Sequence, residues 1–541
     1  MANISELKNL KLEDTATTLT EIERLKAEGN ALHAQGNHQD AYQKYSQAIK
    51  ESAVAPADNA RLAILYANRA ASCLAMKEYL DAMHDGQQGW ARIGTAAHAL
   101  QAWEVCQHAW TSGLSCLPSG TSRPRSWCSK RSSRRADAGH AKAKATAESH
   151  ITQIGSNSSM LAGMPWNRAL KLAETGKLYG GELPSSGYVI LNAYRDFVRG
   201  MQTLQQIVTT RKGDNMEALA DLTNGILRDT RVFHAHPQFF DQLEAQVRFE
   251  ARFSGAWGSG GAKQIQTEAV QRLKTAGWLP VRRALSVTIR GWMMKGFIDD
   301  NMGVASGGVE FYKRIIDVLE WGRRTWANVP SEDRGVIFED SFLYLKKGAG
   351  SGYSLEDIAQ MARDMKAETE ASRRPPDWAL DPGFYASFWI YPVAEALAIL
   401  GWHHMQLGFR QLEGKVSGDR VTTFTQSSKY YVEAAEKYPE DDEHRPYFLA
   451  VALEALWWAG SPLRETLPLC RKIRDVMPKS AELWEFSQMS RNNRNANCKE
   501  AVLFLSDCEK KIASGKATLE SDLLPSDLLE RRRRFDADFE E

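Results

Sequence analysis

The sequence has few cysteines and no apolar segment near its start. Its 541 residues include only 7 cysteines, an odd number, and no Cys-x-x-Cys pair. This argues against a disulfide framework and favours free thiols in a reducing compartment. The first residues, MANISELKNLKLEDTATT, lack the apolar core of a secretory signal peptide. We therefore expect a cytoplasmic protein, and we leave the nucleus open as a second location.

Neither sign of charge is in excess. The chain has 68 basic and 67 acidic residues, so its formal net charge is +1. Such a balance produces no overall field that would attract nucleic acid or anionic lipid, and we predict neither as a partner. The apolar run FYASFWIYPVAEALAILGW, Phe384 to Trp402, is of borderline length for a bilayer. Because Pro392 should break or kink a helix, we predict a buried helical hairpin there.

Motifs for catalysis and for cofactors are missing. Gly255 and Gly260 begin like a phosphate loop, but Gly261 follows and the required Lys-Ser/Thr does not. No Gly-x-Ser-x-Gly elbow or His-Glu-x-x-His helix occurs. His403 and His404 are adjacent, so they point to different faces of a helix and cannot share a metal. We predict that the chain is not an enzyme and holds no cofactor, no metal and no catalytic residue.

Paired acids are the remaining candidates for unusual chemistry. They are Asp299-Asp300 and Asp441-Asp442. We interpret both pairs as loop or cap residues, with nothing nearby that would raise a pKa.

Strand-like alternation is also scarce, whereas helical periodicity is common. In residues 193–210, 239–253 and 308–326 apolar residues recur at steps of three and four, which places one face of a helix on a core. We therefore predict an all-α fold.

Paired helices with small residues at their crossing repeat near the start of the chain. In residues 25–51 the small residues are Gly29, Ala41 and Ala48, Leu32 and Tyr45 fill the space between the helices, and Gly36-Asn37 makes the turn. Residues 62–86 repeat the pattern with Tyr66, Ala70 and Ala82, and residues 89–118 with Gly94, Trp103, Trp110 and Pro118. A period of about 34 residues is that of the tetratricopeptide repeat, whose units stack and leave a concave groove.

Three short motifs resemble one kind of tetratricopeptide module, the carboxylate clamp. They are Lys26-Ala-Glu-Gly-Asn30, Tyr66-Ala-Asn68-Arg69 and Gly89-Trp90-Ala91-Arg92. Such modules occur in the heat-shock organising protein, the small glutamine-rich co-chaperones, and the phosphatase and immunophilin co-chaperones. The resemblance covers about residues 20–118. It implies binding of the Glu-Glu-Val-Asp tail of a heat-shock chaperone of the ninety- or seventy-kilodalton class, by Lys26, Asn30, Asn68 and Arg92.

The chemistry suits these residue types. A peptide that ends in Asp presents two carboxylates close together, which cationic donors and neutral amides can hold. Lys26 and Asn30 are four residues apart and share a helical face, and Arg92 can bond a carboxylate with two parallel donors. The chain departs from the family at Gln88, where the family has a lysine, and about ten residues are missing before the third repeat. The clamp is therefore weakened at Gln88, and the alternative is that Lys26 and Arg92 are solvated charges on a plain scaffold.

These patterns predict the division of the chain. We expect a flexible N-terminus (1–20), a tetratricopeptide domain (21–118), a basic low-complexity linker (119–148), a helical middle domain of unknown function (149–375), a helical C-terminal domain with degenerate repeats (376–526) and a charged tail (527–541). For the linker, a nuclear-localisation or nucleic-acid patch and a gene-model error stay open. The C-terminal repeats are indicated by Tyr431, Ala434 and Pro439, with an ordinary helical bundle as the alternative.

The predicted function is that of a co-chaperone or adaptor whose groove binds an acidic chaperone tail, while the C-terminal helices contact other proteins. One alternative is a scaffold that binds an unrelated peptide. Another is an enzyme with an unrecognised helical active site within residues 150–425.

Overall fold

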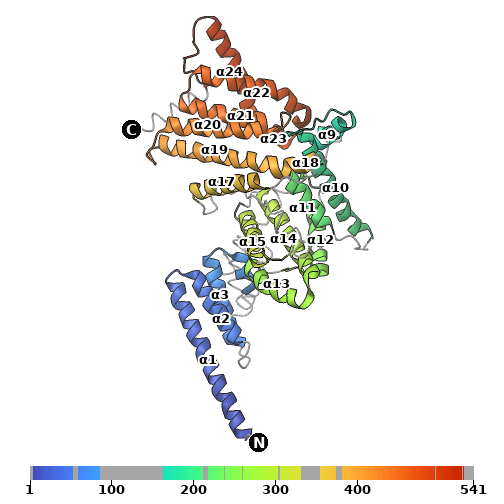
Figure 1. Cartoon of the computed structure of the whole chain (residues 1–541), viewed down its shortest axis with the longest axis vertical. Helices are drawn as coiled ribbons and strands as arrows, with labels where there is room; N and C mark the ends of the chain where they lie inside the picture. The colour runs from blue at the N-terminus through green and yellow to red at the C-terminus, as the bar shows by residue number, and fades with distance from the viewer. Residues whose placement is uncertain are drawn as a thin grey trace, which may run out of the picture. The chain divides into compact units, whose positions relative to one another are not determined.

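Helices form every regular element of the part of the chain that the structure describes, which confirms the predicted all-α fold class. The structure is a computed structural model, and it describes residues 4–52, 59–85, 163–210, 217–236, 238–258, 260–301, 305–329, 354–372, 381–493, 495–526 and 528 (Figure 1). The predicted linker 119–148 and nearly all of the tail 527–541 lie outside these residues. The predicted domain boundaries stay predictions.

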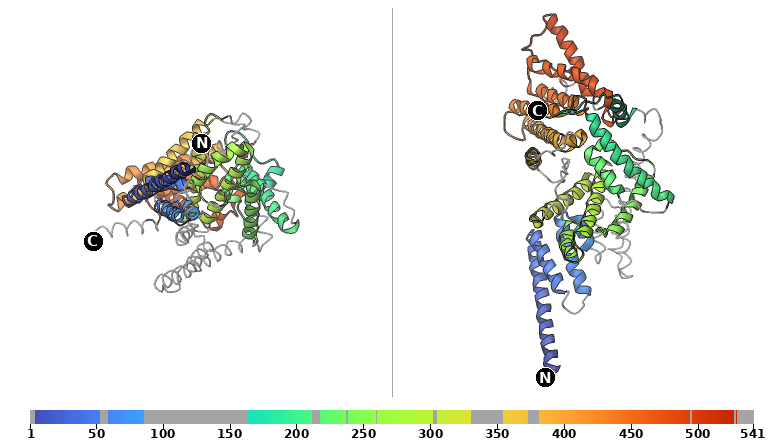
Figure 2. Two further views of the ribbon diagram at one scale, coloured as in Figure 1. Left: turned by 90° about the horizontal axis from the view of Figure 1, so that it is seen from below. Right: turned by 45° about the vertical axis from the view of Figure 1, so that its right-hand side comes forward.

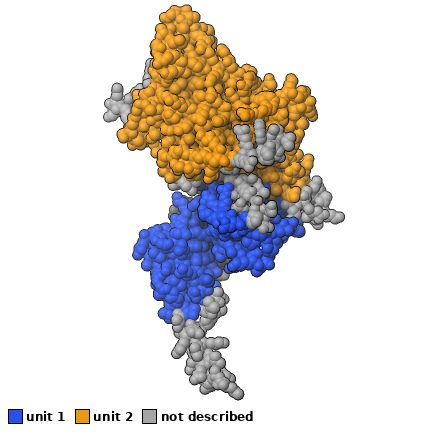
Figure 3. Space-filling view, in the orientation of Figure 1, with its two compact units in different colours: residues 1–150, 243–341 blue, residues 151–242, 342–541 orange. Residues whose placement is uncertain are grey.

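The chain forms two compact units, and each unit joins segments that are distant in sequence (Figure 3). Unit 1 consists of residues 1–150 and 243–341, and unit 2 of residues 151–242 and 342–541. One helix, α12 (Phe239–Ser254), crosses the boundary at 243. We describe each unit by itself.

Unit 1 begins with helices that lie side by side. They are α1 (Ile4–Ala34), α2 (His38–Ser52), α3 (Asn59–Ala75) and the short α4 (Tyr79–Asp85). The views in Figures 1 and 2 agree that α1, α2 and α3 are neighbours. The second segment of the unit adds α13 (Ala262–Ala276), α14 (Trp278–Asn301) and α15 (Ala305–Thr325).

Unit 2 contains a succession of helices in which each packs against the next. The succession runs through α17 (Leu355–Ala371), α19 (Tyr391–Leu412), α20 (Arg420–Lys437), α21 (His444–Ala459), α22 (Leu463–Trp484) and α24 (Ala496–Ala513). Its core is apolar and includes Leu397, Leu453, Leu467 and Leu505. The other elements are α9 (Pro165–Glu174), α10 (Ser186–Thr210), α11 (Ala218–Arg228), η2 (Thr230–Val232), α18 (Pro382–Tyr385), η5 (Ala386–Ile390) and α23 (Gln488–Arg491).

A glycine sets the close crossing of α19 and α20. A Cβ atom on Gly408 would lie 2.7 Å from Cε1 of Phe424, nearer than side-chain carbons approach one another. Phe424 is fully buried in this gap. Because a small residue faces an aromatic ring, the two helices can approach closely at this crossing.

The apolar run at Phe384 to Trp402 is buried but does not form a hairpin. The helical stretch Pro382–Leu412 is long and apolar enough to span a membrane, and 67% of its most apolar window is buried inside the protein. The predicted burial of this run is confirmed, but the predicted hairpin is wrong, because the helix continues past Pro392. Residues 386–390 are wound as a π-helix, and Pro392 follows in the first turn of α19. The wider turn accommodates the proline, which lacks an amide hydrogen, and the helix continues.

Asp441 and Asp442 lie in the loop before α21, as predicted, but both carboxylates are buried, and the prediction that nothing nearby would raise a pKa is wrong for Asp441. Asp441 accepts hydrogen bonds from the Ser185 hydroxyl (2.5 Å) and the Ser186 amide (2.9 Å). Burial raises the pKa of Asp441. Burial acts in the same direction on Asp442, but Arg231 and His444 outweigh it and hold the pKa of Asp442 far below its usual range. Asp299 lies within α14, where burial raises its pKa.

Candidate peptide-binding site

The first helix pair is closed by a glycine and a tyrosine. A Cβ atom on Gly29 of α1 would lie 2.6 Å from Cε1 of Tyr45 of α2, so only glycine permits this approach. Ala41, Tyr45 and Ala48 are buried along α2, as the repeat pattern predicts. The turn falls at residues 35–37, between the end of α1 and the start of α2. This packing fixes the direction in which the neighbouring Asn30 projects.

Two of the predicted clamp residues meet across the repeats. The Tyr45 hydroxyl donates to Oδ1 of Asn30 at 2.8 Å, and Nδ2 of Asn68 on α3 donates to the same oxygen at 3.1 Å. Lys26 lies one helical turn before Asn30 on α1, and its ammonium pairs with Glu23. The structure therefore places Lys26, Asn30 and Asn68 along one face of α1 and α3. Arg92 and Gln88 lie outside the described residues, and their roles stay predictions.

Arg69, which follows Asn68, holds the second helix pair together. Its guanidinium bonds both carboxylate oxygens of Asp85 on α4, at 2.6 and 2.7 Å. The same group lies over the rings of Tyr42 and Tyr66, 5.2 and 5.3 Å from their centroids. Burial raises the pKa of Asp85, whereas pairing with Arg69 opposes that shift. Arg69 is thus engaged within the scaffold, so its role is to position α3 and not to grip a ligand.

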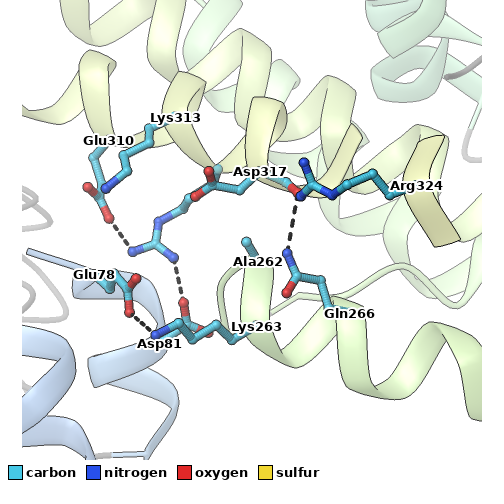
Figure 4. Close-up of a pocket in the computed structure, with 10 residues that line it drawn as sticks. Glu78, Asp81, Ala262, Lys263, Gln266, Glu310, Lys313, Asp317 and Arg324 are labelled. Carbon is cyan, nitrogen blue, oxygen red and sulfur yellow. Dashed lines mark hydrogen bonds and ion pairs between the residues drawn. The ribbon is translucent and has the colours of Figure 1, made fainter. Parts of the chain in front are cut away.

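A buried ion network joins α4 to the second segment of unit 1, and sequence reasoning missed it. Nη1 of Arg314 on α15 bonds the Asp81 carboxylate of α4 at 2.8 Å, and Figure 4 shows Asp81 with Glu310 and Lys313 around the cavity beside this bond. Asp81 also accepts a hydrogen bond from the Gly261 amide at 3.1 Å, and Arg314 pairs in addition with Glu310. The partners are 233 residues apart in the chain, so no local spacing could reveal the pair.

A cavity of about 170 Å³ lies beside this network. Acidic and basic residues line it in equal number: Glu78, Asp81, Glu310, Asp317, Lys263, Lys313, Arg314 and Arg324. One further ion pair, Lys263 to Glu78 at 2.7 Å, links α13 to the loop before α4. Because the charges balance, the cavity favours no ion of either sign. Its residues act as a junction that supports the second repeat.

Unit 2 has a larger cavity, of about 400 Å³, beside the π-helical turn. Its lining includes Trp389, Lys437 and three glutamates, Glu182, Glu370 and Glu436. Surface lysines pair with two of these carboxylates, Lys366 with Glu370 at 3.0 Å and Lys472 with Glu436 at 2.9 Å. In the described parts of the chain, no group of three or more His, Cys, Asp or Glu side chains is arranged to hold a metal ion. That the chain is not an enzyme stays a prediction.

Comparisons with known proteins give two partial similarities. The chain is 35% identical over 112 residues to the DnaJ homolog subfamily C member 7 homolog of Schizosaccharomyces pombe. This match covers 18% of this chain and 23% of that protein. The chain is also 37% identical over 97 residues to the small glutamine-rich tetratricopeptide repeat-containing protein 2 of Saccharomyces cerevisiae. This match covers 16% of this chain and 26% of that protein. The chain thus spans about a quarter of each relative. No family model matches it. These similarities support a tetratricopeptide-repeat type for the matched part of the chain.

Proposed function

We propose that this chain is a tetratricopeptide adaptor of the co-chaperone kind, whose groove binds the acidic C-terminal tail of a cytosolic heat-shock chaperone. One observation carries the proposal: the hydrogen bond between Asn30 and Asn68, with the Lys26 ammonium one turn away. Two side-chain amides and one ammonium group, from two repeats, thus lie on one face of α1 and α3. The similarity to tetratricopeptide proteins supports the same class of function.

The arrangement of Lys26, Asn30 and Asn68 suits the C-terminal carboxylate of a peptide better than an uncharged peptide segment. The Asn30 side chain is exposed and Asn68 is partly exposed, so their amides can turn from each other to a ligand. The side chain of Lys26 is 24% exposed, and its partner Glu23 is 52% exposed. An exposed ion pair of this kind contributes about 1 kcal/mol or less, so an incoming carboxylate can replace Glu23 at little cost.

Titration of the full chain with a peptide that ends in Glu-Glu-Val-Asp tests the proposal. We expect salt-sensitive binding that Lys26→Ala weakens about tenfold, because a charge-assisted hydrogen bond to the carboxylate is lost. Lys44→Ala is the matched control, since Lys44 pairs with Glu28 on the opposite side of α1 and should not affect binding. Equal affinities of the Lys26→Ala and Lys44→Ala proteins would reject the clamp and favour a scaffold that binds another peptide.

A further inference from the structure

A second contact joins α1 and α3 in the same register as the asparagine pair. Oε1 of Glu23 lies 3.7 Å from Nε of Arg61, and both this pair and the Asn30–Asn68 pair join residues that are 38 apart in the chain. Glu23 precedes Asn30 by seven residues, and Arg61 precedes Asn68 by seven residues. Two helices keep the same register over two turns only if they run parallel, so both pairs lie on one shared face.

This shared face of α1 and α3 therefore has two polar positions about 10 Å apart, which is the rise of two helical turns. Between them on α3 lies Ile64, a large apolar side chain that is 51% exposed. Glu23 contacts both neighbouring cations, Lys26 on its own helix and Arg61 on the next. A carboxylate of the protein thus occupies the place between the two cations that a ligand carboxylate would take.

We propose that Arg61 is a second anion-binding position in this groove, and that Glu23 occupies it until an acidic ligand side chain takes its place. The inference rests on the proposed function, since Lys26, Asn30 and Asn68 hold the terminal carboxylate. An extended peptide covers about 10 Å in three residues. The ligand therefore carries an acidic side chain about three residues before its C-terminus, and its intervening apolar side chain lies on Ile64.

The test uses the full chain and two peptides with free C-termini, one ending in Glu-Glu-Val-Asp and one in Gln-Glu-Val-Asp. We expect Arg61→Gln to weaken binding of the first peptide about two- to fivefold, the size of an exposed charge pair, and to leave the second unchanged. Glu23→Gln should strengthen binding of the first peptide by a similar factor. That gain should shrink when Arg61→Gln is also present.

Two variants on the opposite face of α1 serve as controls. Arg24 and Glu21 pair with each other there, so Arg24→Gln and Glu21→Gln should change neither affinity. The inference is overturned if Arg61→Gln affects both peptides equally or neither of them, or if Glu23→Gln weakens binding. If binding still requires the free C-terminus in those cases, the proposed function stands and only the role of Arg61 fails. If neither peptide binds, both fail.

Discussion

At the scale of single residues, the buried carboxylates decide how stability depends on pH. Arg231 connects three of them, since its guanidinium pairs with Asp229 at 2.7 Å, Asp442 at 2.9 Å and Glu443 at 3.4 Å. The Tyr391 hydroxyl donates a further hydrogen bond to Asp442 at 2.6 Å. The pKa values of two neighbouring acids in this network shift in opposite directions. The pKa of Asp442 falls, because the cations Arg231 and His444 outweigh burial, whereas the pKa of Glu443 rises, because burial outweighs the same cations.

Asp442→Asn and Glu443→Gln should therefore have opposite pH profiles. The folded pKa of Asp442 lies below its unfolded value of about 3.9, so its contribution to stability is present above about pH 4 and is lost as the pH falls further. We expect Asp442→Asn to cost about 3 kcal/mol near pH 7 and clearly less at about pH 3. Burial raises the pKa of Glu443, so its charge costs stability at neutral pH and the cost disappears on protonation.

Urea unfolding of the wild type and both variants, near pH 7 and at about pH 3, measures these differences. Relative to the wild type, the free energy of unfolding of Glu443→Gln should decrease as the pH falls, whereas that of Asp442→Asn should increase. If the stability differences of the two variants changed with pH in the same direction, the pKa values of Asp442 and Glu443 would not be shifted in opposite directions.

The residue patterns predicted the contacts of the first repeat but not this network. Gly29, Ala41, Tyr45 and Ala48 follow a local spacing, and their burial follows from that spacing alone. The partners of Asp442 come from segments as far away as Arg231, 211 residues earlier. A pair of adjacent acids in a loop looks the same in sequence whether it is solvated or buried, so its pKa shifts could not be predicted.

At the scale of elements, helix crossings depend on where small residues face aromatic rings. Gly29 faces Tyr45 in α1 and α2, and Gly408 faces Phe424 in α19 and α20. The Tyr45 hydroxyl also bonds Asn30, so the first crossing positions a predicted ligand-binding side chain. One tyrosine thus links the helix crossing to a predicted ligand-binding residue.

Gly29→Ala should destabilise the first helix pair by about 1–3 kcal/mol, because the added Cβ atom would overlap the Tyr45 ring. It should also weaken binding of the acidic peptide, since movement of Tyr45 disturbs Asn30. Gly291→Ala in α14 is a matched control, because the nearest atom to its Cβ would be Val247 Cγ1 at 3.9 Å. That change should stabilise the helix by about 0.5–1 kcal/mol. Thermal unfolding that shifts in the same direction for both variants would refute the assignment of Gly29 to the crossing.

Helix positions were largely predictable from apolar periodicity, and helix continuity was not. The patterns at 193–210, 239–253 and 308–326 correspond to α10, α12 and α15. Pro392 misled the prediction, because it follows a π-helical turn and the helix continues past it. Pro468 and Pro478 likewise lie inside a continuous helix, α22. Neighbouring helices can stabilise such irregular turns, and a sequence window does not contain those neighbours.

At the scale of the whole molecule, the repeats at the start of the chain are completed by helices from residues 262–325. Asp81 on α4 has its partners Gly261 and Arg314 in that later segment. This is why unit 1 is discontinuous in sequence, and why a fragment that ends at residue 118 would lack partners of the second repeat. Experiments on the proposed binding site therefore require the full chain.

Arg314→Ala should loosen α4 and destabilise unit 1 by about 3–5 kcal/mol, because it leaves the buried acids Asp81 and Glu310 without their cation. Hydrogen exchange should become faster in residues 79–85, while α19 to α21 in unit 2 keep their protection. Arg324→Ala is the control, since Arg324 lines the same cavity but is 72% exposed. Unchanged exchange in α4 after Arg314→Ala would mean that the network does not support the second repeat.

The most direct test of binding to a terminal carboxylate is the ratio of two dissociation constants for the full chain. One peptide ends in Glu-Glu-Val-Asp with a free carboxylate, and the other has the same sequence with an amidated C-terminus. We expect the amidated peptide to bind at least about tenfold more weakly, and we expect this ratio to fall towards one in Asn30→Ala and Asn68→Ala. Equal affinity of the unmodified chain for the two peptides would contradict binding of the terminal carboxylate.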